Sequence, residues 1–451
     1  GCGMALYAGK LQRQINQRTL TTAKVVHHRP VIIMGDQSTI NGNRWTFVGR
    51  DMVTNQFVSG MAFLNSRQQV KYLKNSVTNV QVTVDGQLQP LMPPTNTNQR
   101  DFRSRYYHQG ICNQLMVKRV DHISRTSPSP LDIHYYRMLA GSYFNDLPSP
   151  LSTYCSQLIL GDSGAVADRD FRQSIRRLGI IHLFCISGLH VSALVAGIVL
   201  LLTYCRVSRE TSEWLIICVL PVYAVFGGQS VGLIRAVLMT EASLLGRKFY
   251  PLSALDTWAL SLLGGLMINP WLLLDLGGQL SYLLSLGLQV LPPKWGPFRQ
   301  SVTLNLLSFP SIISFIYEFH WLTFLASFVM IPIFTYCMFP AVILSALTYR
   351  YLPGIANLTN TLLLCIQRVL VTVSTCPGMI AFGKPPLIIS CGLFFMTCLA
   401  IDHRWNFNYC FLVLAYIGAF CIIHFQPVGE VTFVDIGQGD SIIIRTPFNR
   451  H

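Results

Sequence analysis

The stretch from Ile181 to Cys205 reads IHLFCISGLHVSALVAGIVLLLTYC and contains no Asp, Glu, Lys or Arg. A bilayer core is crossed by about 20 consecutive apolar residues in a helix. Comparable runs follow, of which the second and third are short or polar. The sequence therefore predicts a polytopic α-helical membrane protein with about 8–10 spans. The candidate spans are 181–205, 212–228, 229–246, 253–269, 271–291, 302–318, 321–348, 355–375, 379–400 and 408–425.

The composition agrees with a membrane protein that carries a soluble part. Of 451 residues, 51% are hydrophobic and 12% charged, against about 25% charged in an average soluble domain. These figures exclude a disordered chain, a collagen, a disulfide miniprotein and a coiled coil. Residues 1–180 carry a net charge of +11 and residues 181–451 only +3. The basic front third indicates a polyanionic partner: nucleic acid, anionic lipid or a wall polymer.

The front of the chain has the pattern of a small β domain. Val80, Val82 and Val84 alternate with polar residues, as in a half-buried strand. Asn41-Gly42 and Asp85-Gly86 are typical of hairpin turns. We predict an OB-like barrel over residues 1–126 and a helical linker over 127–180. The strand-like stretches are 24–34, 45–50, 56–64 and 77–84, and the linker ends in an amphipathic helix with Phe171, Ile175 and Leu178 on one face, expected to approach the membrane.

Loop charge predicts the orientation, because Lys and Arg gather on the cytoplasmic side. With the first span running inward, the inside loops hold eight basic residues. The outside has Lys384 between spans and four arginines before the first span. Both termini and the barrel are then expected outside the cytoplasm, in a multi-pass membrane protein. The inside residues are Arg206, Arg209, Arg247, Lys248, Lys294, Arg299, Arg350 and Arg404, and the four arginines are Arg169, Arg172, Arg176 and Arg177.

An exterior domain requires an upstream span or signal, and none precedes it in this sequence. We therefore expect the natural chain to begin further upstream. Ten of the 13 cysteines lie in the apolar part, where buried thiols are ordinary. Cys112 and Cys155 form a candidate disulfide if the front is extracellular.

Several spans contain polar residues, which are costly in lipid and mark a buried site or a water-filled path. Ser187 and His190 lie in the first span, and Arg235 lies in a later one, ahead of Glu241. Asp275 and Gln279 share a helix face beside the small residues Gly277, Ser281 and Ser285. The serines and glycines are equally compatible with close helix packing. A lone arginine requires a compensating partner.

These residues resemble a known family. LFCISGLH at 183–190 is similar to the LFAISGLH signature of the ComEC family of DNA-uptake channels. Further family segments resemble this chain at two stretches that precede the first span, 158–162 and 171–178, and at Arg235-Ala236. Asn269-Pro270 followed by DLGGQLSY at 275–282 resembles NP…D-x-G-F-Q-L-S-F, with Gly278 and Tyr282 replacing two phenylalanines. The resemblance covers most of 130–425 and implies a transmembrane competence channel domain over 181–426.

The last residues, 427–451, resemble the start of a metallo-β-lactamase-like domain through VTFVDIGQGDSIII at 431–444. Such a domain needs a His/Asp cluster to hold metal, and no such cluster precedes His451. We expect the rest of that domain to lie further downstream, and we expect neither a metal nor nuclease activity from this chain. The alternative is a membrane-anchored metallohydrolase; a small-molecule transporter would show inverted repeats, which are not evident.

The resemblance implies a channel that imports single-stranded DNA during natural transformation, without catalysis or cofactor. The resemblance also implies a location in a bacterial cell membrane and two protein partners, a cytosolic helicase-like ATPase and an extracellular DNA receptor. A further copy of the chain is an additional candidate partner, and the sequence leaves the oligomeric state open. The expected translocation path is Ser187, Gly188, His190, Arg235, Asp275, Gln279 and Ser281. On the barrel, basic residues beside aromatic ones favour DNA binding, unless the aromatics are core. They are Arg44 with Trp45 and Phe47, and Arg100, Arg103 and Arg105 with Tyr106 and Tyr107.

Overall fold

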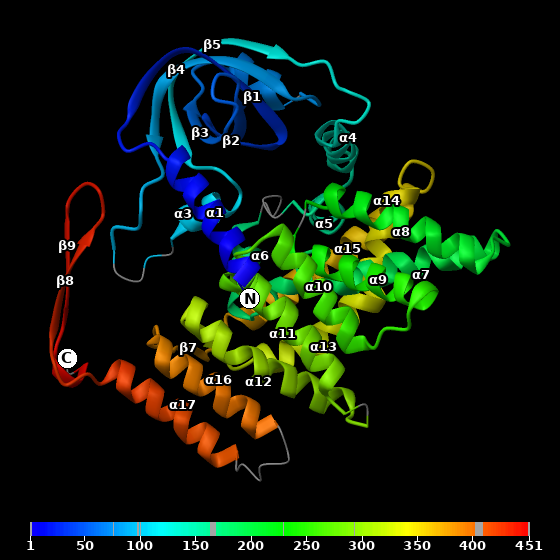
Figure 1. Ribbon diagram of the computed structural model, residues 1–451, viewed down its shortest axis with the longest axis vertical. Helices are drawn as coiled ribbons and strands as arrows, with labels where there is room; N and C mark the ends of the chain where they lie inside the picture. The colour runs from blue at the N-terminus through cyan, green and yellow to red at the C-terminus, as the bar shows by residue number, and fades with distance from the viewer. Residues whose placement is uncertain are drawn as a thin grey trace. The chain divides into compact units, whose positions relative to one another are not determined.

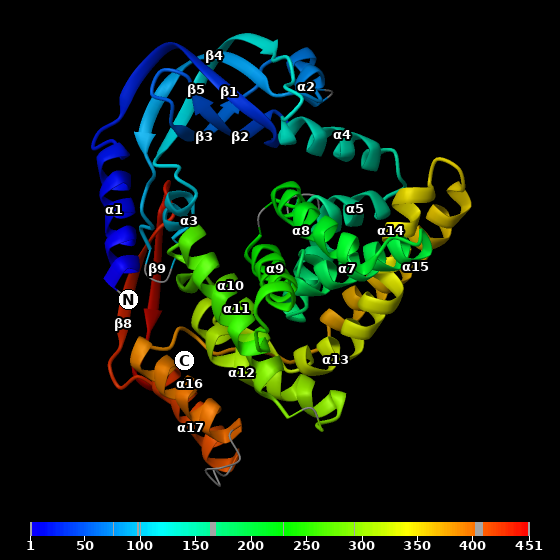
Figure 2. The same cartoon turned by 45° about the vertical axis from the view of Figure 1, so that its right-hand side comes forward.

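The chain divides into two units in the computed structural model (Figure 1, Figure 2). The first comprises residues 1–146 with 269–271, and the second comprises 147–268 and 272–451. The structure describes residues 2–74, 76–96, 99, 101–162, 168–228, 230–292, 294–401 and 409–449.

Five strands form a closed barrel in the first unit, in the order β1-β2-β3-β5-β4. All neighbouring pairs are antiparallel except β3 and β5, which run parallel. The barrel core is filled by alternate residues such as Trp45, Phe47 and Val82. The predicted small β-barrel is confirmed, and it contains a fifth strand, β5, that is not among the strand-like stretches of the sequence. The strands are β1 (Lys24–Asn41), β2 (Arg44–Asp51), β3 (Phe57–Phe63), β4 (Val80–Pro90) and β5 (Asn113–Arg125).

One of the two predicted hairpin turns forms. Asn41 pairs with Arg44 across a turn in which Gly42 has a φ of +63°. The prediction for Asp85-Gly86 is wrong, because both residues lie inside β4. A Cβ atom on Gly86 would lie 2.3 Å from the carbonyl oxygen of Met116, so the glycine is required by the close approach of β5 rather than by a turn.

Helices flank the barrel within the first unit. The helix α4 is tied to β1 by Asp36, whose carboxylate oxygens lie 2.7 Å from Nδ1 of His134 and 2.7 Å from Nε of Arg137. The first helix, α1, has no counterpart among the sequence predictions. The helices are α1 (Cys2–Arg18), α2 (Arg67–Lys74), α3 (Phe102–His108) and α4 (Ile133–Asn145).

The second unit is helical, and its first part holds most of the motif residues. The elements here are α5 (Leu151–Ile159), α6 (Arg169–Arg177), η1 (Ile181–Phe184), α7 (Gly188–Tyr204), α8 (Arg209–Phe226), α9 (Val231–Phe249), α10 (Ala254–Ile268), η2 (Leu272–Leu274) and α11 (Leu276–Val290). The predicted apolar face of α6 is buried, but it packs against α15, where Ser374 donates to Ser174 at 2.9 Å. The amphipathic pattern thus reflects packing within the protein rather than contact with lipid.

The remaining elements follow in two groups. The helices are α12 (Pro297–Ile316), α13 (Thr323–Ile333), the π-helical η3 (Phe334–Met338), α14 (Phe339–Thr348), α15 (Pro353–Ser374), α16 (Leu387–Ile401) and α17 (Tyr409–His424). The short strands β6 (Glu318–His320) and β7 (Met379–Ala381) pair, as do β8 (Glu430–Asp435) and β9 (Asp440–Arg445), and η5 (Pro447–Asn449) follows. Helices α16 and α17 lie side by side (Figure 1, Figure 2).

Two helical segments are long and apolar enough to cross a membrane, among the residues the structure describes. They are Thr323–Thr348, which combines α13, η3 and α14, and Pro353–Ser374. Both coincide with predicted spans. The apolar helices Gly188–Tyr204, Ala254–Ile268, Leu387–Ile401 and Cys410–His424 are shorter. The larger number of spans therefore stays a prediction.

Candidate functional site

The signature at 183–190 forms the entry to α7. After η1 the chain becomes extended at Cys185, and Ser187 caps the helix. The Ser187 backbone N–H donates to Nδ1 of His190 at 3.0 Å, and the Ser187 hydroxyl lies 2.9 Å from the same nitrogen. Because Nδ1 accepts a backbone N–H, the proton of the neutral ring resides on Nε2. The signature is thus a reciprocal cap that fixes one imidazole tautomer.

The His190 ring is enclosed by aromatic side chains. It is 1% exposed and makes T-shaped contacts with Phe334 and Phe339, at centroid distances of 5.6 and 4.6 Å. Its Nε2 has no hydrogen-bond partner among the described residues. A buried polar N–H usually has a hydrogen-bond partner, so the imidazole of His190 is an unusual polar group within this bundle.

Arg235 lies in the second turn of α9 and reaches toward two other helices. Its Nε donates to the hydroxyl of Ser281 on α11 at 2.8 Å, and Nη1 lies 3.1 Å from the sulfur of Met239. A Cβ atom on Gly188, at the start of α7, would lie 2.8 Å from Nη2. A larger residue at this position would require the guanidinium to shift. The beginning of α7, the first turns of α9 and the middle of α11 therefore meet at Arg235.

The charge of Arg235 is not balanced locally. Among the described residues, no carboxylate forms an ion pair with its guanidinium. Its neighbours are a hydroxyl and a thioether, both neutral. An unpaired guanidinium away from bulk water attracts an anion, and Arg matches phosphate with two donors at once. The arrangement can hold a phosphate without chemical change.

The other two residues of the expected path, Asp275 and Gln279, lie in the first turns of α11. Asp275 occupies the N-cap position of α11. The side-chain amide of Gln279 donates to the carbonyl of Leu273 at 2.9 Å and so holds the preceding turn. The structure thus brings Gly188 and Ser281 together at Arg235 and ties His190 to Ser187, whereas Gln279 serves the local turn of its own helix.

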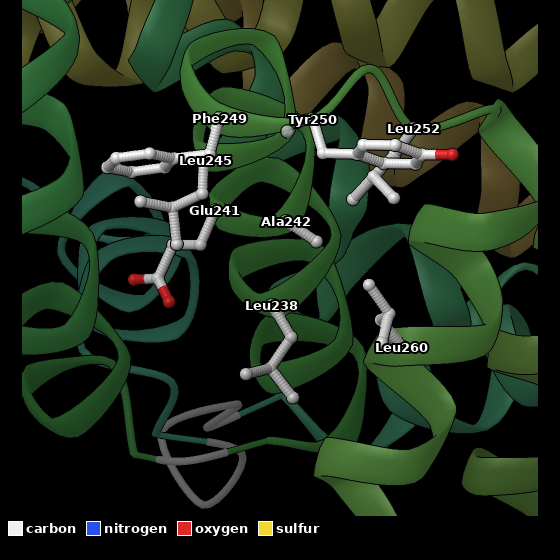
Figure 3. A pocket seen from close by; sticks show the side chains of 9 residues that line it. Leu238, Glu241, Ala242, Leu245, Phe249, Tyr250, Leu252 and Leu260 are labelled. Carbon is white, nitrogen blue, oxygen red and sulfur yellow. The ribbon is translucent and has the colours of Figure 1, made fainter.

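Glu241 lies further along α9 and lines a cavity of about 400 Å³ (Figure 3). The other walls are mainly apolar, including Leu238, Leu245, Phe249 and Leu260. Its Oε1 is buried without a hydrogen-bond partner among the described residues. Glu241 therefore faces this apolar cavity rather than the guanidinium of Arg235.

The barrel carries a second candidate site, on the outward face of β2 and β3. Arg44 pairs with Phe63 across the two strands, and Arg50 pairs with Phe57. Phe63 is 56% exposed and Phe57 is 40% exposed. Neither arginine forms an ion pair within the described part of the chain. Two arginine–phenylalanine pairs, one at each end of a two-stranded ribbon, form a surface on which bases can stack beside bound phosphates.

The sequence prediction for this surface was only partly right. Arg44 is exposed as expected, but Trp45 and Phe47 lie in the barrel core and are 1% and 3% exposed. Their side chains point inward because successive residues of a strand face opposite sides. The same alternation could have identified Phe57, Phe63 and Arg50 from the sequence.

The other predicted barrel residues belong to α3 and the loop before it. Arg103 pairs with Asp101, the N-cap residue, at 3.7 Å, and its guanidinium lies 5.8 Å from the ring centroid of Tyr107. Tyr106 and Tyr107 are half-buried. Arg100 lies outside the described residues, as does the side chain of Arg105. Arg103 is thus already paired with a carboxylate, unlike Arg44.

Comparison with known proteins connects the helical site to a family. A family model described as "Competence protein" matches residues 158–406, which is more than half of the chain. This chain belongs to the ComEC family of competence proteins. It is 26% identical over 377 residues to ComE operon protein 3 of Bacillus subtilis, a match covering 78% of this chain and 48% of that protein. The chain thus spans about half the length of this curated relative, and no solved structure matches it.

The matched region of this ComEC-family chain contains every residue that meets at Arg235. Ser187, Gly188, Arg235 and Ser281 all fall within residues 158–406. The barrel lies before the matched region. The match to the Bacillus subtilis relative covers 78% of the chain and therefore also extends into residues before 158.

The expected disulfide is absent from this ComEC-family structure. Cys112 and Cys155 are both free thiols, buried in the first and second unit respectively. Each residue is at most 2% exposed. Burial also raises the pKa of Cys155 to about 12, which disfavours the thiolate needed for disulfide exchange.

Proposed function

We propose that this chain is the channel component that imports single-stranded DNA across the bacterial cell membrane during natural competence. Membership of the ComEC family supports the link to competence. The observation that carries the channel role is the guanidinium of Arg235, which is held between three helices by neutral partners. A passing phosphate would supply the missing negative charge.

In this proposal Arg235 is a transient phosphate site rather than a storage site. Ser281 orients the guanidinium through Nε, which leaves the Nη2 group beside Gly188 free of a side chain that would cover it. One arginine with neutral neighbours holds a phosphate weakly enough to release it, whereas a cluster of cations would retain it. Conduction needs binding that is favourable but not tight.

The proposed membrane arrangement has eight to ten spans, with the barrel on the outer side. The loop charges of the sequence support this orientation. Apolar side chains support the additional spans. Apolar helices that are shorter than a bilayer core requires still expose residues such as Leu200, Leu387 and Ile388, each more than 70% exposed. Exposed side chains of this kind are stable in lipid and unfavourable in water.

We also propose that the barrel captures DNA on the outward face of β2 and β3. The net charge of +11 over residues 1–180 favours phosphate, and Phe57 and Phe63 offer rings to bases. The chain would then work with a cytosolic helicase-like ATPase that pulls the strand, with an extracellular DNA receptor and with a further copy of itself. The 451 residues contain no Walker A motif, and in this proposal the ATPase is a separate protein.

The experiment that tests the channel role measures transformation frequency in cells that carry Arg235→Ala. We expect a loss of about tenfold or more, because a hydrogen bond to a charged group contributes about 1.5–3 kcal/mol. The matched control is Arg247→Ala, which removes a half-exposed arginine from the last turn of the same helix. Both variants must reach the membrane at the normal level. Normal transformation by the Arg235→Ala strain would refute the proposed role.

A further inference from the structure

Three strands of the barrel, β1, β4 and β5, bring metal-ligating side chains together. His28 comes from β1, Asp85 from β4 and Asp121 from β5. One ligand atom from each lies within 4.8 Å of the other two. Among the described residues, this is the one group of three His, Cys, Asp or Glu side chains whose ligand atoms lie this close together.

The backbone is shaped around these side chains. The β1–β4 register shifts between Val26 and Arg29, and there His28 adopts a φ of +46°. The β4–β5 register shifts on both sides of Val84–Asp85. In this conformation the His28 backbone N–H donates to Asp85 Oδ1 at 2.7 Å. The regular sheet is interrupted in both ladders where the three ligand residues meet.

The carboxylates are fixed while the imidazoles are open to solvent. The side chains of Asp85 and Asp121 are 23% and 16% exposed, and those of His27 and His28 are 75% and 80% exposed. Asp121 Oδ1 accepts from Arg119 at 2.7 Å, while Oδ2 lies 3.3 Å from Nδ1 of His28. Nδ1 of His27 lies 3.8 Å from Asp85 Oδ1. Each carboxylate thus keeps capacity for a further partner on the side of the histidines.

We propose that His28, Asp85 and Asp121 bind one divalent transition-metal ion of the zinc type, with His27 as a fourth ligand. Imidazole nitrogen combined with carboxylate oxygen suits zinc and its neighbours, whereas calcium and magnesium take oxygen ligands. Bonds of about 2.0–2.2 Å to the ion require the ligand atoms to close by about 1 Å, which the two exposed imidazoles can do by side-chain rotation.

The ion would join β1, β4 and β5 where their ladders are interrupted. Its binding would stabilise the barrel, because a ligand that binds only the folded state lowers its free energy. Its positive charge would also offset the negative charge of the two carboxylates, so that this side of the basic domain remains positive. The site requires neither DNA nor a channel, and its test is independent of the proposed function.

The test measures metal binding to the purified 451-residue chain in detergent after treatment with a chelator. Isothermal titration with Zn²⁺ gives the stoichiometry, and the visible absorption of Co²⁺ as a probe reports nitrogen and oxygen ligation. We expect one ion per chain. His28→Asn removes the imidazole while keeping a residue that tolerates a positive φ, and Asp121→Asn removes a carboxylate charge. Each should weaken binding by about tenfold or more, since even outer-shell changes cost that much.

The control is His122→Asn, which removes an exposed histidine from the position next to Asp121. It should leave the affinity unchanged. The proposal is overturned if the unaltered chain binds no Zn²⁺. It is also overturned if His28→Asn and Asp121→Asn both bind Zn²⁺ with the affinity of the unaltered chain. Circular dichroism of each metal-free variant distinguishes loss of a ligand from loss of the fold.

Discussion

At the scale of single residues, the arrangement around Arg235 depends on the lack of a side chain at Gly188. A side chain at Gly188 would occupy the space next to Nη2, where a Cβ atom would lie 2.8 Å away. The glycine in the signature therefore does more than allow close helix packing. It keeps one face of the guanidinium uncovered, in line with the first turn of α7.

The variant Gly188→Ala tests this dependence. The added methyl group must displace the guanidinium or the start of α7, so we expect transformation to fall by about tenfold, as for Arg235→Ala. If the two residues act as a unit, their effects are not additive, and the double variant should be no worse than either single one. Transformation frequency at matched membrane level measures this. Fully multiplicative losses would show that Gly188 acts elsewhere.

A second prediction at this scale concerns pH. The hydrogen bond to Asp36 raises the pKa of His134, with Asp132 assisting and burial and Arg137 opposing. A group whose pKa rises on folding stabilises the folded state below its unfolded value, near 6.5, and loses that contribution as pH rises through the folded value. We therefore expect α4 to be held more firmly on the barrel at pH 6 than at pH 8, by up to about 1 kcal/mol.

Amide hydrogen-exchange protection factors of α4, which correct for intrinsic exchange, measure this difference. In the variant His134→Asn the difference should disappear, whereas in His122→Asn it should persist. Equal protection at the two pH values in the unaltered chain would contradict the assignment of the ion pair between His134 and Asp36.

At the scale of elements, the ribbon of β2 and β3 carries an arginine–phenylalanine pair at each end. Phe63 beside Arg44 and Phe57 beside Arg50 are separated by the cross-strand pairs Thr46–Met61 and Val48–Ser59. This separation of six residues corresponds to about 20 Å along a strand. A single strand of DNA lying along the ribbon could therefore stack on both rings.

The variants Phe63→Ala and Phe57→Ala test the ribbon by fluorescence anisotropy with labelled single-stranded DNA. Each should weaken binding by about five- to hundredfold, since stacking of a base on an aromatic ring contributes about 1–3 kcal/mol. Arg44→Ala should reduce the slope of log affinity against log salt by about 0.7. Met92→Ala removes an exposed apolar side chain outside the strands and should bind normally. Equal affinity of the phenylalanine variants would exclude this face.

Much of the fold could be predicted from the sequence, because its strands alternate clearly and its helices are strongly apolar. The barrel, the turn at Asn41-Gly42 and the buried face of α6 follow from local patterns. Helix α1 does not, since its residues carry no clear apolar period. The Asp85-Gly86 prediction was wrong because the glycine is there for a contact with β5, thirty residues further on, which no local pattern reports.

The candidate site was predictable in its members but not in its contacts. Motif residues identified Gly188, Arg235 and Ser281, yet nothing in the sequence says that the first lies against the guanidinium and the last accepts its hydrogen bond. Gln279 shares a helix with Ser281 but turns to Leu273. Trp45 and Phe47 follow Arg44 closely in the sequence, but neighbouring residues of a strand face opposite sides. Closeness in sequence therefore does not place their rings on the surface beside Arg44.

At the scale of the whole molecule, the proposed function requires the barrel outside and the loop after α7 inside the cell. A short epitope inserted at the turn Asn41–Gly42 should be accessible to antibody on protoplasts with intact membranes. The same epitope at 206–208 should become accessible only after permeabilisation. The reverse pattern would contradict the orientation that the loop charges predict.

Closure of the barrel also has a consequence for how the chain folds. The parallel pairing of β3 with β5 joins Val58 to Asn113, 55 residues apart, so β5 must be made before the barrel can close. Non-local pairings of this kind slow folding. Until β5 inserts, β3 and β4 each present an open row of hydrogen-bonding groups, which is a template for aggregation. A chain interrupted before residue 113 should therefore accumulate as aggregates, whereas one that reaches residue 125 can seal both rows at once.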